Sequence, residues 1–424
     1  MTAMNIQRGR ALEKLIGEFS SRFFMKDFVW WDVKYISGGR RKQHPADLLL
    51  VLNRECVVVS VKGTDGRTKA PDRLRLWLED KVWDGSKSAK TGMQRLKRVP
   101  FQARNLWDET RDFPADALIP KCGICLVECT QEPFSPIEFQ MRQPGCEIPI
   151  HVLSINDFLN VVLWLGSIWD VFDYLKRRAS IRSIFSGINQ ERPVLAFYLL
   201  RAKDFAGFAS EDKARLCERH QLHMIKNLGS YAERERLAGW VNAVIHGLHT
   251  RHPDMESFVP PELEQYREPK DARRGYLQMA AMLNELPMSM KANIGREVQT
   301  MVQNLRGSGK CGCKAYRRLY EKCVFVFACF SQMSRTERIR SLKKLIDAAL
   351  YRYEAMESLG VAYNADDDRS GFDLLLCRGI PVVTADTVRL ADAVFRPPDT
   401  QIANPFGEAR PYSPPPQKTH KIER

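Results

Sequence analysis

The sequence has no run of eighteen apolar residues, the length that a helix needs to cross a membrane. Its first residues, MTAMNIQRGRALEK, also lack the apolar core of a secretion signal. Eleven cysteines stand at irregular spacings in a chain of 424 residues, unlike the disulfide framework of a small secreted domain. We therefore expect a soluble cytoplasmic protein with reduced cysteines and no membrane partner.

Negative charge is scarce relative to positive charge. The chain has 51 Asp and Glu against 65 Lys and Arg, so its formal net charge is +14. An excess of this size favours a polyanionic partner, with nucleic acid first and an anionic membrane surface second. A basic surface that binds nothing in particular is the plain alternative.

Residues 44–65, HPADLLLVLNRECVVVSVKGTD, predict two short buried strands joined by a polar turn. If Arg54-Glu55 is the two-residue loop of this hairpin, Asp47 on the first strand lies directly opposite Lys62 on the second. Because side chains alternate along a strand, Ser60 and Lys62 share the face of Asp47. Burying a charge at the end of such strands costs free energy unless the charge is paired or has a function. This hairpin is therefore the candidate active site.

The hairpin resembles the PD-(D/E)-x-K phosphodiesterase superfamily of restriction enzymes and repair nucleases, through Pro45-Ala46-Asp47 and Ser60-Val61-Lys62. The resemblance implies a restriction-endonuclease-like fold and a site that uses Mg²⁺ or Mn²⁺. It also gives Lys62 the role of orienting the nucleophile. The sequence departs from the pattern at Ser60, where the second metal carboxylate is expected. Restriction enzymes with an S-x-K version take a glutamate from the following helix instead, which nominates Glu79.

The same resemblance suggests further members of the site. The superfamily tends to carry a glutamate on the helix before the hairpin, which is Glu13 here, and a glutamine near the metal, which matches Gln94. Asp65 and Asp84 are substitutes for Glu79. The implied metal ligands are Asp47, Glu79, Glu13 and the backbone carbonyl of Val61. The implied catalytic side chains are Asp47, Lys62, Ser60, Glu13, Glu79 and Gln94.

Basic residues flank the hairpin on both sides. A glycine-containing loop precedes it, and a segment that combines basic residues with tryptophans follows it. Such residues can track the phosphates of DNA, although a solvated surface explains them equally well. The residues that we predict to bind nucleic acid are Arg40, Arg41, Lys42, Lys87, Lys90, Arg95, Lys97 and Arg98.

Hydrophobic periodicity predicts an α/β domain over residues 1–178, with a mixed central sheet flanked by helices. Its elements, in order, are a helix over 8–24, a strand over 28–36, the hairpin, a helix over 86–97, strands over 122–130 and 147–153, and a helix over 157–176 capped by Ser154 or Asn156. Cys122 and Cys125 are three residues apart on one strand and so point to opposite faces. They are therefore predicted core residues and not a zinc pair.

Beyond residue 178 helical periodicity dominates 195–250, 272–306 and 314–358. We predict a mainly α-helical domain over 179–395, which the prolines near 260 could divide into two lobes. Residues 396–424 are rich in proline and polar residues, which predicts a disordered tail.

Together these features predict a metal-dependent DNA endonuclease, with bacterial restriction or anti-phage defence as its setting by analogy. One alternative is a catalytically inactive nuclease-fold protein that binds nucleic acid or acts as a scaffold. Another is a nuclease subunit whose helical domain forms a homo-oligomer or binds a partner protein that activates it.

Overall fold

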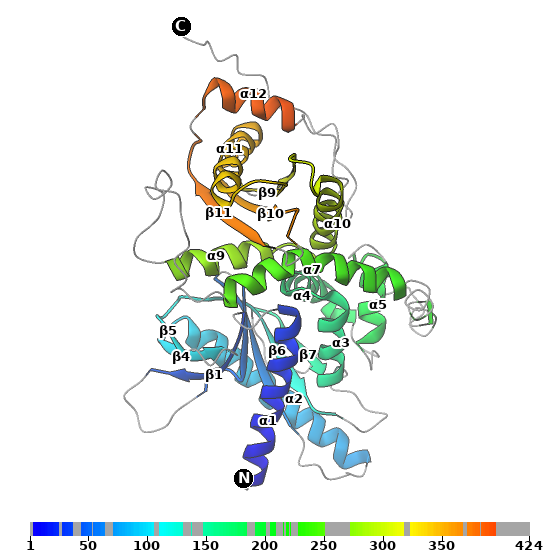
Figure 1. Cartoon of the computed structure of the whole chain (residues 1–424). Coiled ribbons are helices and arrows are strands. Elements are labelled where there is room, and N and C mark those ends of the chain that lie inside the picture. The colour runs from blue at the N-terminus through cyan, green and yellow to red at the C-terminus, as the bar shows by residue number, and fades with distance from the viewer. Residues whose placement is uncertain are drawn as a thin grey trace.

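The computed structural model of the chain is shown in Figure 1. Apart from a few isolated residues, it describes residues 3–24, 28–36, 44–52, 54–63, 71–105, 110–129, 147–184, 191–200, 204–208, 228–250, 272–317, 323–367, 371–381 and 383–395. The predicted DNA contacts Arg40, Arg41 and Lys42, the carboxylate Asp65, the break near 260 and the tail 396–424 lie outside the described residues. None of the described helices is long and apolar enough to cross a membrane.

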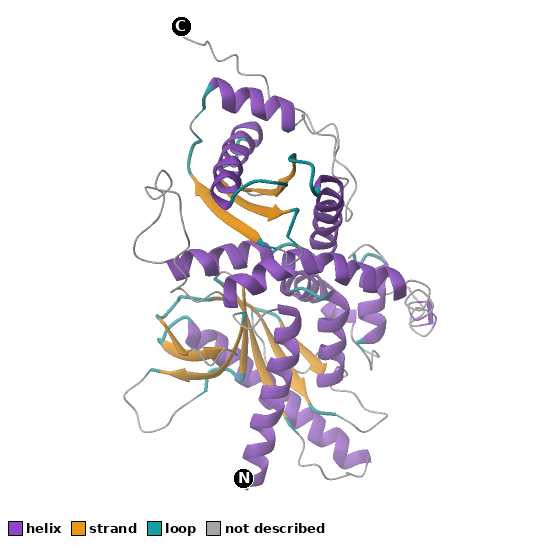
Figure 2. Cartoon of the chain, viewed as in Figure 1, coloured by secondary structure: helices purple, strands orange, loops and turns teal. Residues whose placement is uncertain are grey.

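A mixed sheet lies in the N-terminal half of the chain, as predicted (Figure 2). Within the described residues it has seven strands in the order β5-β4-β1-β2-β3-β6-β7. They are β1 (Val29–Tyr35), β2 (Leu48–Leu52), β3 (Glu55–Lys62), β4 (Phe101–Asn105), β5 (Thr110–Phe113), β6 (Ile119–Val127) and β7 (Ile150–Ser154). Strands β3, β6 and β7 run parallel to one another, and the other neighbours are antiparallel. The sequence analysis missed β4 and β5.

Helices cover both faces of this sheet because its central strands are apolar on both sides. Leu48 and Leu50 belong to the cluster that packs against α1 (Ala3–Phe24), α3 (Ile155–Leu165) and α4 (Ile168–Arg178). Leu49 and Val58 lie on the other face, against α2 (Pro71–Leu96). The predicted helix 86–97 is thus the C-terminal part of a longer helix, and the flanked α/β sheet is confirmed.

The register of the central hairpin differs from the prediction. Leu52 pairs with Glu55 and Leu48 with Val59, so Asp47 stands level with Ser60 and not with Lys62. Glu55 is part of β3 and pairs with Leu52 of β2 and Ile119 of β6, and its Oε1 lies 2.7 Å from the Nζ of Lys121 on β6. The pairing moves by two positions in total, an even number, so Asp47, Ser60 and Lys62 still share one face.

The predicted helix over 157–176 is two helices. Ser154 caps α3 by accepting a hydrogen bond from the Asp157 amide at 3.0 Å, as predicted. Gly166 then ends α3 with φ +71°, a conformation that favours glycine, and Ser167 caps α4. Cys122 and Cys125 pack on opposite faces of β6, which confirms their assignment to the core.

The prediction of a mainly helical C-terminal domain is wrong for residues 311–378. The described residues there include a sheet of four strands in the order β11-β10-β9-β8. They are β8 (Cys311–Arg317), β9 (Cys323–Phe330), β10 (Glu357–Asn364) and β11 (Phe372–Arg378). Every residue of β9, CVFVFACF, is buried, and a continuous apolar run does not distinguish a buried strand from a helix.

Helices surround the second sheet and join it to the first. They are α5 (Arg192–Leu200), α7 (Leu228–Thr250), α9 (Ala272–Asn284), α10 (Met288–Leu305), α11 (Arg335–Tyr353) and α12 (Ala385–Val394). In Figure 1 α7 and α9 lie across the middle of the molecule, between the two sheets. One hydrophobic cluster runs from β2 and β3 through α7, α9 and α10 to β9 and β10, so the two sheets share a continuous core.

Candidate active site at the start of β2 and the end of β3

Asp47 lies at the beginning of β2, with its carboxylate directed at the end of β3. Its Oδ2 accepts a hydrogen bond from the Val61 amide at 2.6 Å, and the Ser60 hydroxyl also hydrogen-bonds to it. Burial raises the pKa of Asp47, while the Val61 amide, Lys62 and Ser60 act in the opposite direction. The site therefore has a half-buried carboxylate at its centre.

The backbone carbonyl of Val61 points to the same side of β3 as its amide. In a strand the N–H and C=O of one residue point to the same side, and the Val61 amide points at Asp47, so its carbonyl does too. The next carbonyl, that of Lys62, points the other way and accepts from the Glu128 amide at 2.8 Å. Ser60 is 3% exposed, and its hydroxyl forms a hydrogen bond with the Asp47 carboxylate.

Lys62 extends from β3 along α2. A side chain at Gly85 would place its Cβ 3.2 Å from the Lys62 Cγ, so this glycine makes room for the lysine stem. The Lys62 Nζ lies 3.5 Å from the Ser88 hydroxyl. Its positive charge lowers the pKa of both Asp47 and Glu13.

Glu13 reaches the same site from α1. Burial raises its pKa to about 7, and the neighbouring charge of Asp47 is the next largest cause. Asp32 raises this pKa further, whereas Arg10 and Lys62 lower it. The structure thus brings together Asp47, Ser60, Val61, Lys62 and Glu13 from the predicted set.

Asp32 is the site residue that the sequence analysis missed. The β1–β2 register pairs Trp31 with Leu48, which puts Asp32 level with Asp47. The β1–β4 pairing shifts register between Trp31 and Lys34, and Asp32 has φ +48°, as expected of an irregular residue in a strand. Its carboxylate forms an ion pair with Lys34. The sequence did contain one signal for this residue, because Asp32 is the only acidic residue in the predicted strand 28–36.

The structure places Glu79 and Gln94 at a distance from this group. Glu79 is half-buried on α2, six residues before Gly85, which corresponds to about 9 Å along the helix axis. Gln94 is exposed. It stands two residues after Gly92, which faces the sheet, and two residues correspond to about 200° of helix rotation, so Gln94 points away from the sheet. Asp84 is also exposed. Its charge contributes to the raised pKa of Cys125, whose sulfur packs against Gly85.

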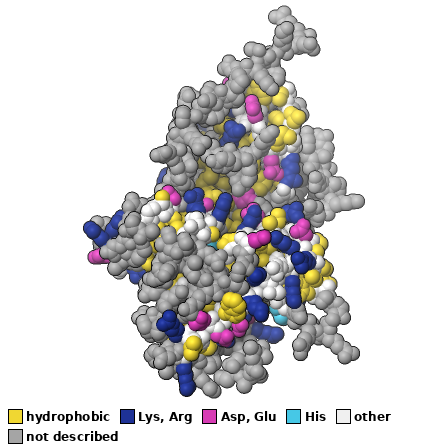
Figure 3. Space-filling view, turned by 180° about the vertical axis from the view of Figure 1, so that it is seen from behind, with side chains coloured by type: hydrophobic (Ala, Val, Ile, Leu, Met, Phe, Trp, Pro, Cys, Tyr) yellow, Lys and Arg dark blue, Asp and Glu magenta, His cyan; other side chains and the backbone are white. Residues whose placement is uncertain are grey.

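The predicted basic surface runs along α2 and the turn that follows it. The side chains that point away from the sheet are exposed or half-buried and comprise Lys87, Lys90, Lys97 and Arg98. Arg95 lies over the ring of Tyr35, 5.6 Å from its centroid. In the view of Figure 3 lysine and arginine side chains are spread among acidic and hydrophobic ones, so this face of the molecule is not uniformly basic.

The described residues contain no group of three or more His, Cys, Asp or Glu side chains arranged to hold a metal ion. The charges of Asp47 and Asp32 both raise the pKa of Glu13, although the three side chains do not form such a group. Comparison with protein-family models, curated proteins and solved structures found no match for the chain. The geometry of the site is therefore the basis for a functional assignment.

Gly92 of α2 offers a test of how this site is built. A Cβ at Gly92 would collide with the carbonyl oxygen of Pro45, two residues before Asp47. We expect Gly92→Ala to push the helix from the strand and lower the free energy of unfolding by about 1–3 kcal/mol. Urea denaturation measures this, with Gly229→Ala as the control, since no described atom lies within 4 Å of a Cβ there. Equal stability of the two variants would contradict the close approach.

Proposed function

We propose that the protein is a metal-dependent DNA endonuclease that hydrolyses phosphodiester bonds at the Asp47–Lys62 site. The observation that carries the proposal is the Asp47 carboxylate held by the Val61 amide at the ends of two paired strands, with Lys62 on the same face and with Glu13 near enough for the Asp47 charge to raise its pKa. The chain order also supports it. Helix α1, the antiparallel β1-β2-β3, helix α2 and, after β4 and β5, the parallel β6 occur in the order that the PD-(D/E)-x-K resemblance implies. Restriction or anti-phage defence is the setting that this resemblance suggests.

The donors of the site fit Mg²⁺ or Mn²⁺, because carboxylate and carbonyl oxygens are the ligands that these cations prefer. The raised pKa values of Asp47 and Glu13 also favour a bound cation. A cation between the two carboxylates would offset the repulsion from Asp47 that helps to raise the pKa of Glu13. Asp47, Glu13 and the Val61 carbonyl would hold the ion, with Asp32 as a further carboxylate. When bound, such an ion activates water and stabilises charge on the scissile phosphate.

Lys62 supplies the fixed positive charge in this mechanism. Its stem is held against Gly85, so the ammonium group is positioned before substrate binds. There it can hydrogen-bond the attacking water and offset the negative charge that grows on the phosphate. Ser60 is neutral and hydrogen-bonds to Asp47, so Glu13 and Asp32 have to provide the negative charge that a second carboxylate on β3 would have supplied.

Incubation with supercoiled plasmid and linear duplex tests the proposal. We expect cleavage with Mg²⁺ or Mn²⁺, none with EDTA, and none with Asp47→Asn. The asparagine oxygen can still accept from the Val61 amide, so this variant should fold. Asp80→Asn, an exposed change on α2, is the control.

One observation favours a second function, that of a non-catalytic nucleic-acid-binding protein. Ser60, a neutral residue, occupies the position where the resemblance expects a metal carboxylate. Salt-sensitive DNA binding without cleavage at any metal concentration would support this reading against the nuclease. Cleavage that begins only after a partner protein is added would instead identify a nuclease subunit under control.

The pH dependence of cleavage is expected to report Glu13. A carboxyl group must lose its proton before it can bind a cation, and the pKa of Glu13 is raised to about 7. Below that pH we expect the rate at low Mg²⁺ to fall by about tenfold per unit, and above it to level off. More Mg²⁺ should move the midpoint to lower pH, because the ion competes with the proton.

Rate–pH profiles of Glu13→Gln and Glu18→Gln complete this test. Glu18 lies on the same helix and is exposed, paired with Lys14. Glu13→Gln should weaken metal binding and remove the midpoint near 7, whereas Glu18→Gln should leave the profile unchanged. An unchanged profile in Glu13→Gln would exclude Glu13 from the metal site.

A further inference from the structure

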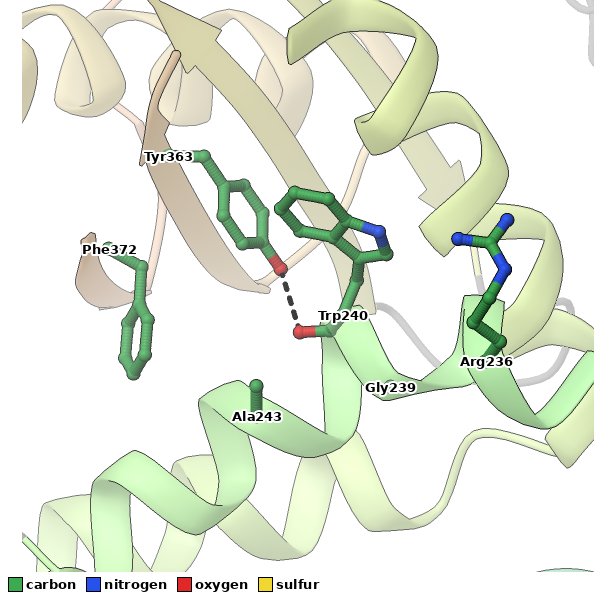
Figure 4. Close-up of a pocket in the computed structure, with 6 residues that line it drawn as sticks. All are labelled: Arg236, Gly239, Trp240, Ala243, Tyr363 and Phe372. Atoms are coloured by element: carbon green, nitrogen blue, oxygen red, sulfur yellow. Dashed lines mark hydrogen bonds between the residues drawn. The ribbon is translucent and has the colours of Figure 1, made fainter. Parts of the chain in front are cut away.

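Strand β11 forms one edge of the second sheet, and helices cover both of its faces. The side chains of residues 374–377 point alternately into the core shared with α7 and into the cluster around α11. On the α7 side, the Tyr363 hydroxyl of the adjacent β10 donates to the Trp240 carbonyl at 3.3 Å, and Phe372 of β11 lies against the same helix (Figure 4). Residues 374–377 are nevertheless only half-buried, and no other described strand lies beyond β11.

Every second backbone group of β11 points away from the sheet. The Gly379 amide donates to the Met356 carbonyl at 2.8 Å, which fixes the hydrogen-bonded positions of the antiparallel β10–β11 pair. Such positions recur at every second residue, so the backbone of Leu375 bonds to β10. The N–H and C=O groups of Leu374 and Leu376 therefore face outwards, where no described strand pairs with them.

The two edges of this sheet differ in their protection against a further strand. The opposite edge, β8, carries the exposed Lys314 and Arg317, and charged side chains discourage pairing at a sheet edge. The centre of β11, residues 374–377, is LLLC and has no charge, proline or glycine. Ile380 and Val383, which are 83% and 50% exposed, extend the apolar surface past the end of the strand. Strand β11 therefore has the properties of an edge that pairs with another chain.

A second copy of β11 is complementary to this edge in the antiparallel orientation. Outward-facing residues have to pair with outward-facing residues, which leaves few registers. When Leu374 of one copy pairs with Leu376 of the other, Leu375 faces its own equivalent, and each of the three leucines faces a leucine. No like charges meet in this register, because Asp373 and Arg378 both face uncharged residues. A contact between identical surfaces requires this kind of self-complementarity.

We propose that two copies of the chain associate through β11, with the two strands antiparallel and a two-fold axis at Leu375. The second sheets of the two copies then form one continuous sheet. Leu374 of each copy exchanges both N–H···O bonds with Leu376 of the other, and the leucine side chains lose contact with water. The proposal goes beyond the nuclease function and does not depend on it, because the contact involves neither Asp47 nor Lys62.

Sedimentation equilibrium of the full chain tests the proposal. We expect the mass to rise with protein concentration from the 48.8 kDa of one chain towards twice that value. Leu376→Pro removes an outward N–H that does not bond to β10, and its ring occupies the place of the second strand. This variant should therefore keep its fold and associate at least about tenfold more weakly than the wild type.

A proline on the opposite edge of the same sheet is the matched control. The Ser331 amide donates to the Lys310 carbonyl at 3.0 Å, so the same alternation makes the Ala315 N–H face outwards from β8. Ala315→Pro should leave association unchanged, because the proposed contact does not involve β8. Urea denaturation checks that both proline variants are folded.

Cysteine crosslinking tests the register without any proline. Facing residues of an antiparallel pair that are not hydrogen-bonded have Cα atoms about 4.5 Å apart, which is within the range of a disulfide. On oxidation in air Leu375→Cys should therefore form a disulfide between two copies. Leu374→Cys faces Leu376 of the other copy and should crosslink no more than the wild type does.

Four outcomes would overturn the proposal. They are a wild type that keeps the mass of one chain at every concentration, equal association of the two proline variants, equal crosslinking of the two cysteine variants, and a chain that stays monomeric but binds an unrelated synthetic peptide of alternating leucine and threonine. The last outcome would identify a foreign strand as the occupant of the β11 edge.

Discussion

Lys62→Met is expected to lower the rate of DNA cleavage by about 100-fold or more while the protein still folds and binds metal. Methionine keeps an unbranched stem against Gly85, so packing between β3 and α2 is retained. The substitution removes the charge that lowers the pKa of Asp47 and Glu13, and with it the positive charge that the proposed mechanism requires. Single-turnover cleavage at saturating Mg²⁺ measures the rate, and Mn²⁺ titration measures metal binding separately.

Lys121→Met is the matched control for this variant. Lys121 lies on the adjacent β6 and binds Glu55 at the opposite end of β3, with a side chain 47% exposed. Its replacement should leave cleavage unchanged. A Lys62→Met protein that cuts at the wild-type rate would move the active site away from this hairpin, even if cutting remained metal-dependent.

Glu191→Ala is expected to lower the free energy of unfolding by about 3–5 kcal/mol, a large part of the stability of a typical domain. Arg178 and Glu191 are completely buried and form two hydrogen bonds of 2.7 Å each. The Tyr174 hydroxyl also donates to the Glu191 carboxylate. Without this carboxylate the Arg178 charge would remain inside the protein uncompensated. Urea denaturation followed by circular dichroism measures the effect.

The chain contains a control with the same chemistry in water. Glu233 and Arg236 form a two-point ion pair with the same 2.7 Å distances on the surface of α7. Glu233→Ala should change stability little, because solvent screens exposed ion pairs. The double variant Glu191→Leu with Arg178→Met should recover much of the loss, since both buried charges are removed together. If Glu191→Ala and Glu233→Ala behaved alike, burial would not set the cost.

Local patterns were sufficient to predict much of the first sheet. Helix α1, strand β1, the hairpin, the later part of α2 and strands β6 and β7 all follow from periodicity and turn residues. Asp47, Ser60 and Lys62 were correctly placed on one face because side chains alternate along a strand and the register differs from the prediction by an even number of positions. The same rule assigned Cys122 and Cys125 to opposite faces.

The errors fall where the deciding contact is far away in the sequence. The hairpin register is fixed together with the parallel pairing of β3 and β6, which aligns Glu55 with Ile119, and the hairpin sequence alone does not contain that partner strand. In the C-terminal half β9 is a strand because β8 and β10 pair with it. Its apolar run is equally compatible with a buried helix, so periodicity could not separate the two.

The sequence by itself determined the polarity of each segment, the helices and strands with strong periodicity, and the face of the sheet on which Asp47 and Lys62 lie, because these properties depend on neighbours a few residues apart. Tertiary structure alone decided which carboxylates join them. Glu13 and Asp32 approach Asp47 from α1 and β1, while Glu79 stays on α2 about 9 Å along the helix from the lysine contact. Distances between separate elements are set by packing, and packing is a property of the whole chain.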